Sequence, residues 1–541
     1  MAEPDQAPSP ANPAGIAVSA APAPTASATG KRMVTTALLL AMAVVALEQT
    51  VVSTAMPSII AQLHGLDIYP WVFSAYLLAS TVTTPIYGKL ADLWGRKPIL
   101  LFGLVVFTVG SVCSGRASSM PELIAMRVVQ GLGAGAVGPM VLTLLGDLFS
   151  LEQRARVQGL FSAVWGVSSV AGPLLGGYLT DGLSWRWVFY VTVPFSAVAA
   201  WVLVRFVHET VRREASKPID WVGAALLAVG STALLLAILG GSTSSSGRSV
   251  AFLVLAAAVL ATLVVVERRA IDPILPPDLF LRPTIAAAIA GSFLIGALMF
   301  AIDTYVPLYV QGVLGGKATE AGAVITSLFL SWAISVAVAA RVVVRFGFRT
   351  TACFGMALIT LGMAGLVVAA MIPAWSVPIF QVSLAITGIG FGPASLSCTL
   401  NVQNEVDWNR RGVATGAIQF FRTLGGATGV GLLGATLAFE FGRRLLAAHA
   451  GDIDIVAALR PETHGRLTHD QLALVQSALG RTLRDVFGQM FVLAAVGIAC
   501  AARLAPGRAR SRVEPAEAPP HARRPDDGRA VTAGDLIPEG S

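Results

Sequence analysis

Charged residues are scarce in this sequence. Lys, Arg, Asp and Glu make up 13% of the 541 residues, whereas about a quarter of the residues in a soluble domain are charged. Hydrophobic residues make up 55% of the chain. They gather into repeated runs of about 18 residues or more, the length that crosses a bilayer as a helix. The composition therefore excludes an ordinary soluble domain and predicts an all-α polytopic membrane protein.

Metal-ligating and redox-active residues are scarce as well. The 4 cysteines fall separately in apolar runs, and none belongs to a C-x-x-C pair. This spacing predicts neither a metal site nor a disulfide framework. The loops offer no cluster of His, Cys or carboxylates for a membrane-embedded enzyme, and no Walker A pattern indicates ATP-driven transport. We therefore expect neither an enzyme nor a cofactor or metal.

Fourteen apolar runs are long enough to be spans. They lie near residues 33–55, 70–90, 98–115, 121–145, 157–179, 187–207, 219–239, 250–267, 284–312, 319–340, 350–371, 376–398, 411–437 and 485–505. The N-terminal tail is rich in Ala, Pro, Ser and Thr and the C-terminal tail in Pro, Arg and Glu. Both tails are predicted to be disordered. The expected order is a cytoplasmic tail (1–32), a six-helix bundle (33–207), two linker helices with their loops (208–283), a second six-helix bundle (284–505) and a second cytoplasmic tail (506–541).

A long outer loop is predicted near residues 438–484, before the last run. Its stretch LTHDQLALVQSALGRTL has leucines and a valine at helical spacing. This pattern fits an amphipathic helix on the membrane surface or over the outer vestibule. It fits equally well a solvated hairpin packed on the spans, and the sequence leaves both interpretations open.

The net charge is +7, and the distribution of the basic residues agrees with the predicted topology. With the N-terminus inside, the inner segments carry roughly 19 Lys and Arg and the short outer loops about 4, as the positive-inside rule predicts. An even number of spans places both termini inside. We therefore expect a multi-pass protein of the cytoplasmic (inner) membrane, whose partners are the lipid bilayer and a small-molecule substrate rather than nucleic acid. We expect a monomer; whether a periplasmic adaptor binds it stays open.

The loop after the second run reads GKLADLWGRKPIL. Its first glycine allows two helices to approach closely, its aspartate can cap a helix or pair with a basic residue, and its second glycine permits a tight turn. The stretch resembles motif A of the major facilitator superfamily, G-x-L-a-D-r-x-G-r-k-x-x-l. The resemblance implies a cytoplasmic gate between two helical bundles, formed by Gly88, Asp92, Gly95, Arg96 and Lys97. The alternative is an ordinary basic loop.

A degenerate copy of this motif follows the tenth run. The sequence ARVVVRFGFRT keeps the R-x-G frame at Arg345 and Gly347, but Val344 stands where the acidic residue is expected. The copy predicts two related halves. Because the acidic residue is missing, the copy does not predict a charged contact between the bundles at the second motif.

The fourth run contains RVVQGLGAG, which resembles the family's motif B, R-x-x-q-G-x-g-a. The family gives the arginine, here Arg127, a role in proton transfer. An arginine inside a span costs about 2.5–3.5 kcal/mol on insertion scales, so a partner or a water-filled cavity is expected. The alternative is that Arg127 snorkels near the outer end of its span.

The fifth run contains GVSSVAGPLLGGYL, which resembles motif C, G-x-x-x-G-P-x-x-G-G, the family's mark of exporters that work as antiporters. Ser168 replaces the first glycine of that pattern. The matching residues are expected to make the helix thin and locally bent. They are Gly172, Pro173, Gly176 and Gly177.

The first run ends in LEQTVVSTAMPSI, which resembles the first-span signature L-D-x-T-i-V-n-x-A-L-P-x-I of the fourteen-span drug:proton antiporter branch. Glu48 replaces the aspartate and Ser53 the asparagine. The resemblance implies the major facilitator fold, with two six-helix bundles and two additional helices between them. It also implies multidrug efflux, in which amphipathic, lipophilic or cationic drugs leave in exchange for protons by alternating access. The alternative is a dedicated exporter of an endogenous metabolite, siderophore or lipid.

Three charged residues are the candidates for proton coupling or for binding a substrate charge: Glu48, Asp303 and Arg127. Glu48 lies about 15 residues, or roughly 22 Å, into its span, where a carboxyl group should face the bundle interior. It is predicted either to take part in coupling or to pair structurally with a neighbour such as Arg127. Asp303 lies near Tyr305 and Tyr309, which are candidates to line a pocket, unless the helix ends after Pro307 and leaves it at the outer rim.

The substrate site is expected near the midplane, between the two halves. Sites for drug-like molecules are apolar and aromatic with a few polar groups. The candidate lining residues are Gln130, Phe161, Trp165, Gln419 and Phe420, each with helix packing as the alternative. Arg422 fits the pattern of the branch, and its role stays open.

Overall fold

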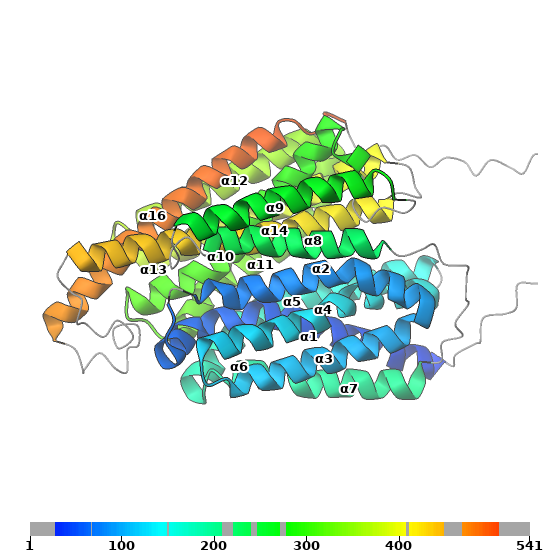
Figure 1. Ribbon diagram of the computed structural model, residues 1–541, viewed down its shortest axis with the longest axis horizontal. Coiled ribbons are helices and arrows are strands. Elements are labelled where there is room, and N and C mark those ends of the chain that lie inside the picture. The colour runs from blue at the N-terminus through cyan, green and yellow to red at the C-terminus, as the bar shows by residue number, and fades with distance from the viewer. Residues whose placement is uncertain are drawn as a thin grey trace, which may run out of the picture.

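A computed structural model describes residues 28–66, 68–148, 151–207, 220–239, 246–270, 277–406, 411–447 and 468–507. These residues form helices and the turns that join them (Figure 1). The predicted disordered tails lie outside the described part at residues 1–27 and 508–541. The first helix begins at Ala28, inside the range predicted as a tail.

The first bundle contains α1 to α7. Their bounds are α1 Ala28–Leu63, α2 Pro70–Trp94, α3 Arg96–Arg116, α4 Met120–Leu148, α5 Leu151–Gly182, α6 Trp187–Tyr190 and α7 Thr192–Phe206. The run predicted as a single span near 187–207 is divided between α6 and α7, which meet at Val191. Within the bundle α3 packs on α4, α2 on α4, and α1 on α5 and α7.

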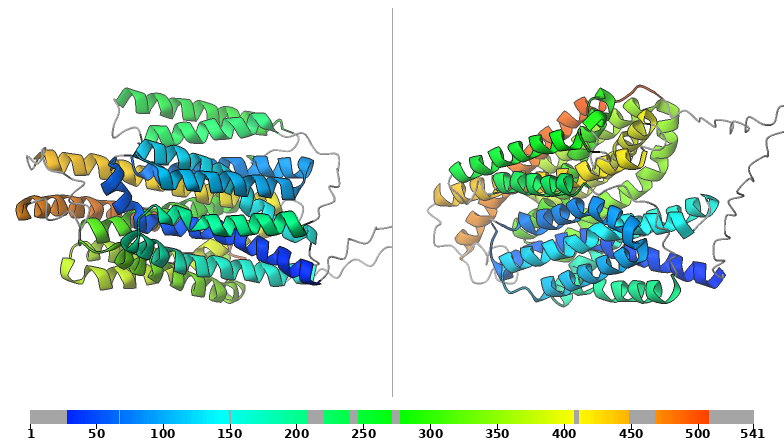
Figure 2. Two further views of the ribbon diagram at one scale, coloured as in Figure 1. Left: turned by 90° about the horizontal axis from the view of Figure 1, so that it is seen from below. Right: turned by 45° about the vertical axis from the view of Figure 1, so that its right-hand side comes forward.

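The second bundle contains α10 to α16. Its helices are α10 Pro283–Gly312, α11 Ala318–Phe346, α12 Phe348–Ala369, α13 Ser376–Glu405, α14 Arg411–Ala447 and α16 His469–Ala501, with the short 3-10 turns η2 Pro277–Leu279 and η3 Pro373–Trp375. Between the bundles in sequence lie α8 Trp221–Leu239 and α9 Ser246–Glu267. Helix α8 contacts α2 of one bundle and α14 of the other, and α9 packs on α8. The two linker helices therefore lie on the outside of the bundle pair (Figure 2).

A helix lies over each of the fourteen predicted spans. Among the described residues, twelve helices are long and apolar enough to cross a membrane. The two that do not meet this criterion are α2 and α5, which are 25 and 32 residues long but rich in Gly, Ser and Thr. Twelve spans are therefore supported, and the count of fourteen stays a prediction.

The predicted outer loop at 438–484 is shorter than expected. Helix α14 continues to Ala447, and α16 already begins at His469, so both ends of that range are helical. Thr468 caps α16 in a capping box with Gln471. The leucine-spaced stretch is therefore the first part of the last long helix, and its Val475, Leu479 and Leu483 are buried in the core. The helical interpretation of this stretch is confirmed, but a separate surface helix and a hairpin are both wrong for residues 469–483.

The first helix, α1, begins and the last helix, α16, ends at one end of the bundle pair, here called the terminal face (Figure 1). The Gly507 carbonyl accepts a hydrogen bond from the backbone nitrogen of Phe348, the first residue of α12, at this face.

Each of the two halves has a similar glycine turn at the terminal face. Gly95 between α2 and α3 has φ 95° and ψ 157°, and Gly347 between α11 and α12 has φ 84° and ψ 169°. A side chain rarely adopts such angles, so both turns require their glycine, as the predicted repeat implies.

The two bundles touch near the other end, here called the far face. Helix α5 packs on α11, α2 on α14, and α1 on α10. The Gln311 side chain donates a hydrogen bond of 3.0 Å to the Thr54 carbonyl across the interface. Ser74 likewise donates to the Ala427 carbonyl at 3.0 Å. Both donors are buried, so the bundles are held together on the far-face side.

Candidate functional site

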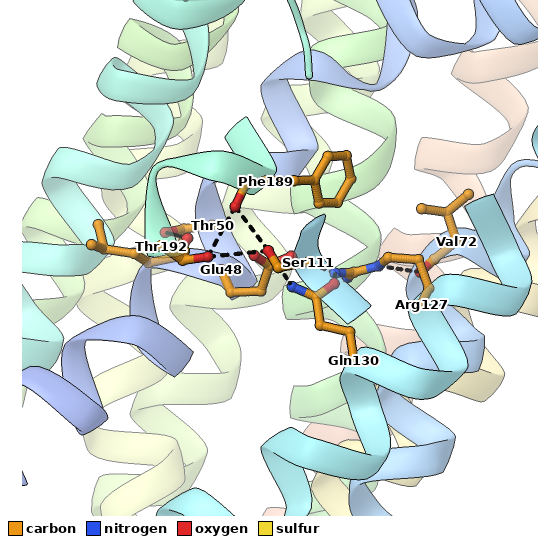
Figure 3. Close-up of polar contacts among 9 residues, drawn as sticks. Glu48, Thr50, Val72, Ser111, Arg127, Gln130, Phe189 and Thr192 are labelled. Carbon is orange, nitrogen blue, oxygen red and sulfur yellow. Dashed lines mark hydrogen bonds and ion pairs between the residues drawn. The ribbon is translucent and has the colours of Figure 1, made fainter. Parts of the chain in front are cut away.

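A buried ion pair joins Glu48 on α1 to Arg127 on α4 (Figure 3). The Arg127 Nη1 atom contacts the Glu48 Oε1 atom, and the two side chains are 1% and 0% exposed. Removing two charges from water is costly unless they satisfy each other. The pair provides this compensation within the first bundle. The partner expected for an arginine inside a span is therefore Glu48.

The pair continues into a chain of polar contacts that crosses the first bundle (Figure 3). Arg127 donates to the Gln130 side chain at 2.7 Å, and Gln130 donates to the Ser111 hydroxyl on α3 at 3.2 Å. The Ser111 hydroxyl lies 3.1 Å from the Thr192 hydroxyl on α7. These side chains are all buried. The connection therefore runs from α1 through α4 and α3 to α7.

Two neighbours fix the position of the Arg127 guanidinium. Its Nε donates to the Val72 carbonyl on α2 at 3.0 Å. The guanidinium also lies over the Tyr76 ring, 4.2 Å from the ring centroid, where the ring's negative face attracts a cation. An arginine held in this way does not reach the membrane surface. The snorkelling alternative for Arg127 is therefore wrong.

Close packing of α3 on α4 holds the network in register. A methyl group placed on Gly110 of α3 would lie 2.5 Å from the backbone nitrogen of Gln130 on α4. Real side chains do not approach so closely, so this position needs glycine. No sequence pattern singles out Ser111 and Thr192 as site residues, because single hydroxyl residues are common in apolar helices.

The second oxygen of Glu48 has no hydrogen-bond partner in the described structure. A buried polar atom without a partner is costly and is often connected with function. One carboxylate oxygen is thus held by Arg127, whereas the other is buried without a hydrogen bond among the described residues. The structural pairing with Arg127 is thus confirmed, and the coupling role of Glu48 stays a prediction.

Asp303 is buried in the second bundle, with 2% of its surface exposed. Helix α10 continues past Pro307 to Gly312, so the alternative of an exposed residue at the outer rim is wrong. The Ser53 side chain of α1 interacts with the Asp303 carboxyl from the other bundle. One carboxyl oxygen of Asp303 has no partner in the described structure. Asp303 therefore lies at the bundle interface, apart from the Glu48 network.

The two tyrosines near Asp303 are packing residues. The Tyr305 hydroxyl donates to the Val430 carbonyl, and the Tyr309 ring packs against those of Phe380 and Phe487. Both tyrosines are buried in a hydrophobic cluster that contains residues of both bundles.

The predicted lining residues are dispersed. Gln130 belongs to the polar network, and Phe161 lies in the core of the first bundle with the half-buried Trp165 against it. Phe420 packs with Leu227 and Leu263 of the linker helices. For the aromatic residues of this set, the structure favours helix packing.

Gln419 is exposed and accepts a hydrogen bond of 2.5 Å from Arg422. Arg422 also donates to the Ser395 hydroxyl on α13 at 3.3 Å. Both of these partners are neutral, and no ion pair joins Arg422 to a carboxylate in the described part of the chain. Arg422 is therefore paired with neutral oxygens in the described structure, and its role stays open.

The glycines of the predicted motif C lie on α5 where two other helices pack closely against it. Gly172 and Gly176 lie against α1, and Gly177 lies against Ala318 and Thr319 at the start of α11. A methyl group on Gly177 would be 2.6 Å from the Ala318 carbonyl oxygen. Small residues allow such close approach of helix backbones. This face therefore forms part of the contact between the bundles.

Replacing Gly177 with alanine is expected to destabilise the protein by about 1–3 kcal/mol, the usual cost of overpacking a close contact. The melting temperature of the purified protein in detergent measures the effect. Gly182 on the same helix is the matched control, because a methyl group there would meet no atom within 4 Å. Equal melting temperatures for the Gly177→Ala and Gly182→Ala variants would contradict the close contact.

Comparison with known proteins shows the family. The model of the Major Facilitator Superfamily matches residues 38–430. The chain belongs to the major facilitator superfamily. This transporter is 35% identical over 420 residues to the multidrug transporter protein MdtP of Bacillus subtilis (strain 168), covering 77% of each chain. It is also 35% identical over 470 residues to the uncharacterized MFS-type transporter Rv1877 of Mycobacterium tuberculosis (strain H37Rv), covering 86% of this chain and 68% of the relative.

The fold of the transporter also matches solved structures. One is a bacterial homolog of the human lysosomal transporter Spinster, in an inward-facing and unoccupied conformation. The TM-score is 0.64 at 15% sequence identity, and the match covers 88% of this chain and 98% of the other. At this identity the likeness supports the fold alone. The predicted major facilitator fold is thus confirmed. The match to this family of transporters supports the prediction that the protein is not an enzyme.

The motif A loop of the transporter lies at the terminal face. The Lys97 amine donates to the carbonyls of Val207 at 2.6 Å and Val204 at 3.2 Å, which ties the loop to α7 of its own bundle. A methyl group on Gly88 would meet nothing within 4 Å. The expected close helix approach at Gly88 is therefore wrong for this arrangement. The backbone of α2 continues through Asp92, whose side chain is outside the described part, so its predicted pairing stays a prediction.

Proposed function

We propose that this protein is a proton-coupled antiporter that exports amphipathic, lipophilic or cationic drugs across the cytoplasmic membrane by alternating access. The observation that carries the proposal is the buried Glu48–Arg127 pair, with one carboxylate oxygen left without a partner. Similarity to MdtP, which is named as a multidrug transporter, supports the choice of drugs as substrates.

Glu48 is proposed to carry the proton. When ionised, it neutralises Arg127; when protonated on the free oxygen, it releases the guanidinium from its counter-charge. Each proton therefore changes the charge balance of a buried site, where such changes are large in energy. The hydrogen-bonded side chains from Arg127 to Thr192 connect this change in charge to α3 and α7, across the first bundle. Asp303 is proposed as a second site for a proton or for a substrate cation.

We propose that the terminal face lies in the cytoplasm. The basic residues of the motif A loop and of its degenerate copy lie at this face, as the positive-inside rule favours. The described arrangement, closed near the far face, then corresponds to the inward-facing half of the cycle. Rocking of one bundle on the other produces the other half. Proton entry supplies about 2.3 kcal/mol per charge per 100 mV of membrane potential.

The transport proposal predicts that a substrate dye releases a preformed pH gradient. In everted membrane vesicles with an acidic interior, a dye carried inward exchanges for protons carried outward, so the interior becomes less acidic. The fluorescence of a pH-sensitive probe measures this change after dye addition. Vesicles without the transporter give the control. Dye movement that is equally fast after the gradient has been collapsed would exclude proton antiport.

A substrate panel distinguishes drugs from a single endogenous compound. Growth of a drug-sensitive host that expresses the transporter is measured with lipophilic cations, neutral lipophilic drugs and acidic compounds. Resistance to several unrelated cations supports multidrug export. Resistance to none of them, together with export of a compound made by the host of origin, supports the dedicated metabolite exporter instead.

A further inference from the structure

One carboxylate at the far face reaches from the first bundle into the second. Asp181, in the last turn of α5, accepts hydrogen bonds from the backbone nitrogens of Ala318 at 3.2 Å and Thr319 at 2.9 Å. It also accepts one from the Thr319 hydroxyl at 2.8 Å. All three donors belong to the first turn of α11. A single side chain therefore makes three polar contacts across the bundle interface.

These contacts replace a helix cap that α11 does not supply itself. The first nitrogens of a helix have no partner within the helix, and an aspartate is one of the side chains that best satisfy them. The residue at the cap position of α11 is Lys317, whose side chain makes no capping hydrogen bond. A carboxylate is also attracted by the positive end of the helix dipole. Asp181 provides both effects from the other bundle.

The position of Asp181 ties this cap to the contact between the bundles. Gly177, one turn earlier on α5, lies directly against the same residues of α11. Rocking the bundles apart at the far face would separate α5 from α11 and break all three hydrogen bonds. Asp181 itself is exposed to solvent, so water can replace its partners after separation. The contact therefore favours the closed arrangement without locking it.

We propose that Asp181 is a positioning residue of the far-face gate, which caps α11 while the gate is closed and releases it in each transport cycle. The inference rests on alternating access, which is part of the proposed function. It does not depend on the substrate or on proton coupling. The capping bond sets the ratio of the two conformations, while the Glu48 site responds to the proton.

The test measures the ratio of open to closed gates in Asp181→Ala. In a variant that lacks the native cysteines, spin labels are attached at Ser119→Cys of the first bundle and Met371→Cys of the second, both exposed near the far face. Double electron–electron resonance on the full-length protein in lipid nanodiscs gives the distance distribution. Loss of a helix cap, typically about 1 kcal/mol, should raise the open fraction relative to the closed one about fivefold.

Two further variants separate a gate role from a structural one. Glu122→Ala removes another exposed carboxylate at the far face, which bonds to Ser118 within its own bundle, and should leave the distances unchanged. Asp181→Asn keeps a capping oxygen and should stay closer to the wild type than Asp181→Ala. The proposal is overturned if Asp181→Ala leaves the distribution unchanged, or if Glu122→Ala or Asp181→Asn shifts it equally. No substrate is needed, so failure of drug export would appear only in the vesicle experiment.

Discussion

Replacing Glu48 with glutamine is expected to abolish proton-driven drug export. Glutamine has nearly the same size and keeps an oxygen that can accept from Arg127, but it neither gains nor loses a proton. The site would then remain in one charge state throughout the cycle. Dye-dependent release of the pH gradient should fall at least about tenfold, which corresponds to about 1.4 kcal/mol or more in coupling. The measurement is the fluorescence assay in everted vesicles, normalised to the amount of transporter.

Glu48→Asp is the matched control for this prediction. It restores the aspartate of the resembled first-span signature and keeps an ionisable carboxyl group, although the group is one methylene shorter. Coupled transport should therefore persist in this variant. Full coupled transport in Glu48→Gln would remove Glu48 from the proton pathway and leave Asp303 as the proposed carrier.

The sequence predicted the features that depend on local patterns. Apolar runs placed the helices, and the motif A stretch and its degenerate copy indicated related turns at Gly95 and Gly347. The predicted end of α14 and the predicted start of α16 were wrong, because the charged and polar residues at 438–484 were interpreted as a loop. A helix that continues beyond the membrane carries polar residues without losing its hydrogen bonds, so composition alone does not define its end.

Contacts between distant residues were harder to predict. A buried arginine requires a partner, and this argument correctly named Glu48 among the neighbours of Arg127. No comparable rule selects Asp181, because a polar residue at the end of a span normally faces water. Its role depends on how the two bundles are docked. The packing of Phe420 on the linker helices depends on tertiary arrangement in the same way.

The site and the gate occupy different parts of the molecule. The Glu48 network lies within the first bundle, whereas the hydrogen bonds of Asp181, Gln311 and Ser74 join the two bundles. Asp303 lies at the contact between the bundles, since it is buried in the second bundle and interacts with Ser53 of the first. Ser53 lies five residues after Glu48 on α1. Helix α1 is therefore the element through which a change at Glu48 would reach the bundle interface.

Removing the arginine of the pair is expected to have the largest effect on stability. Arg127→Gln leaves the Glu48 carboxylate buried without a counter-charge, and breaking a buried pair in this way costs about 3–5 kcal/mol. The variant also loses the contact with the Tyr76 ring. A marked fall in the melting temperature of the purified protein in detergent is the expected result.

The double variant Glu48→Gln with Arg127→Gln tests whether charge is the cause. Replacing both members of a buried ion pair with neutral groups is often harmless to stability, so the melting temperature should recover most of the loss. Transport should not recover, because the ionisable carboxyl is absent. An unchanged melting temperature in the single Arg127→Gln variant would mean that Glu48 is uncharged in the resting protein. The proton would then already occupy the free oxygen, and the ion pair would belong to a later step of the cycle.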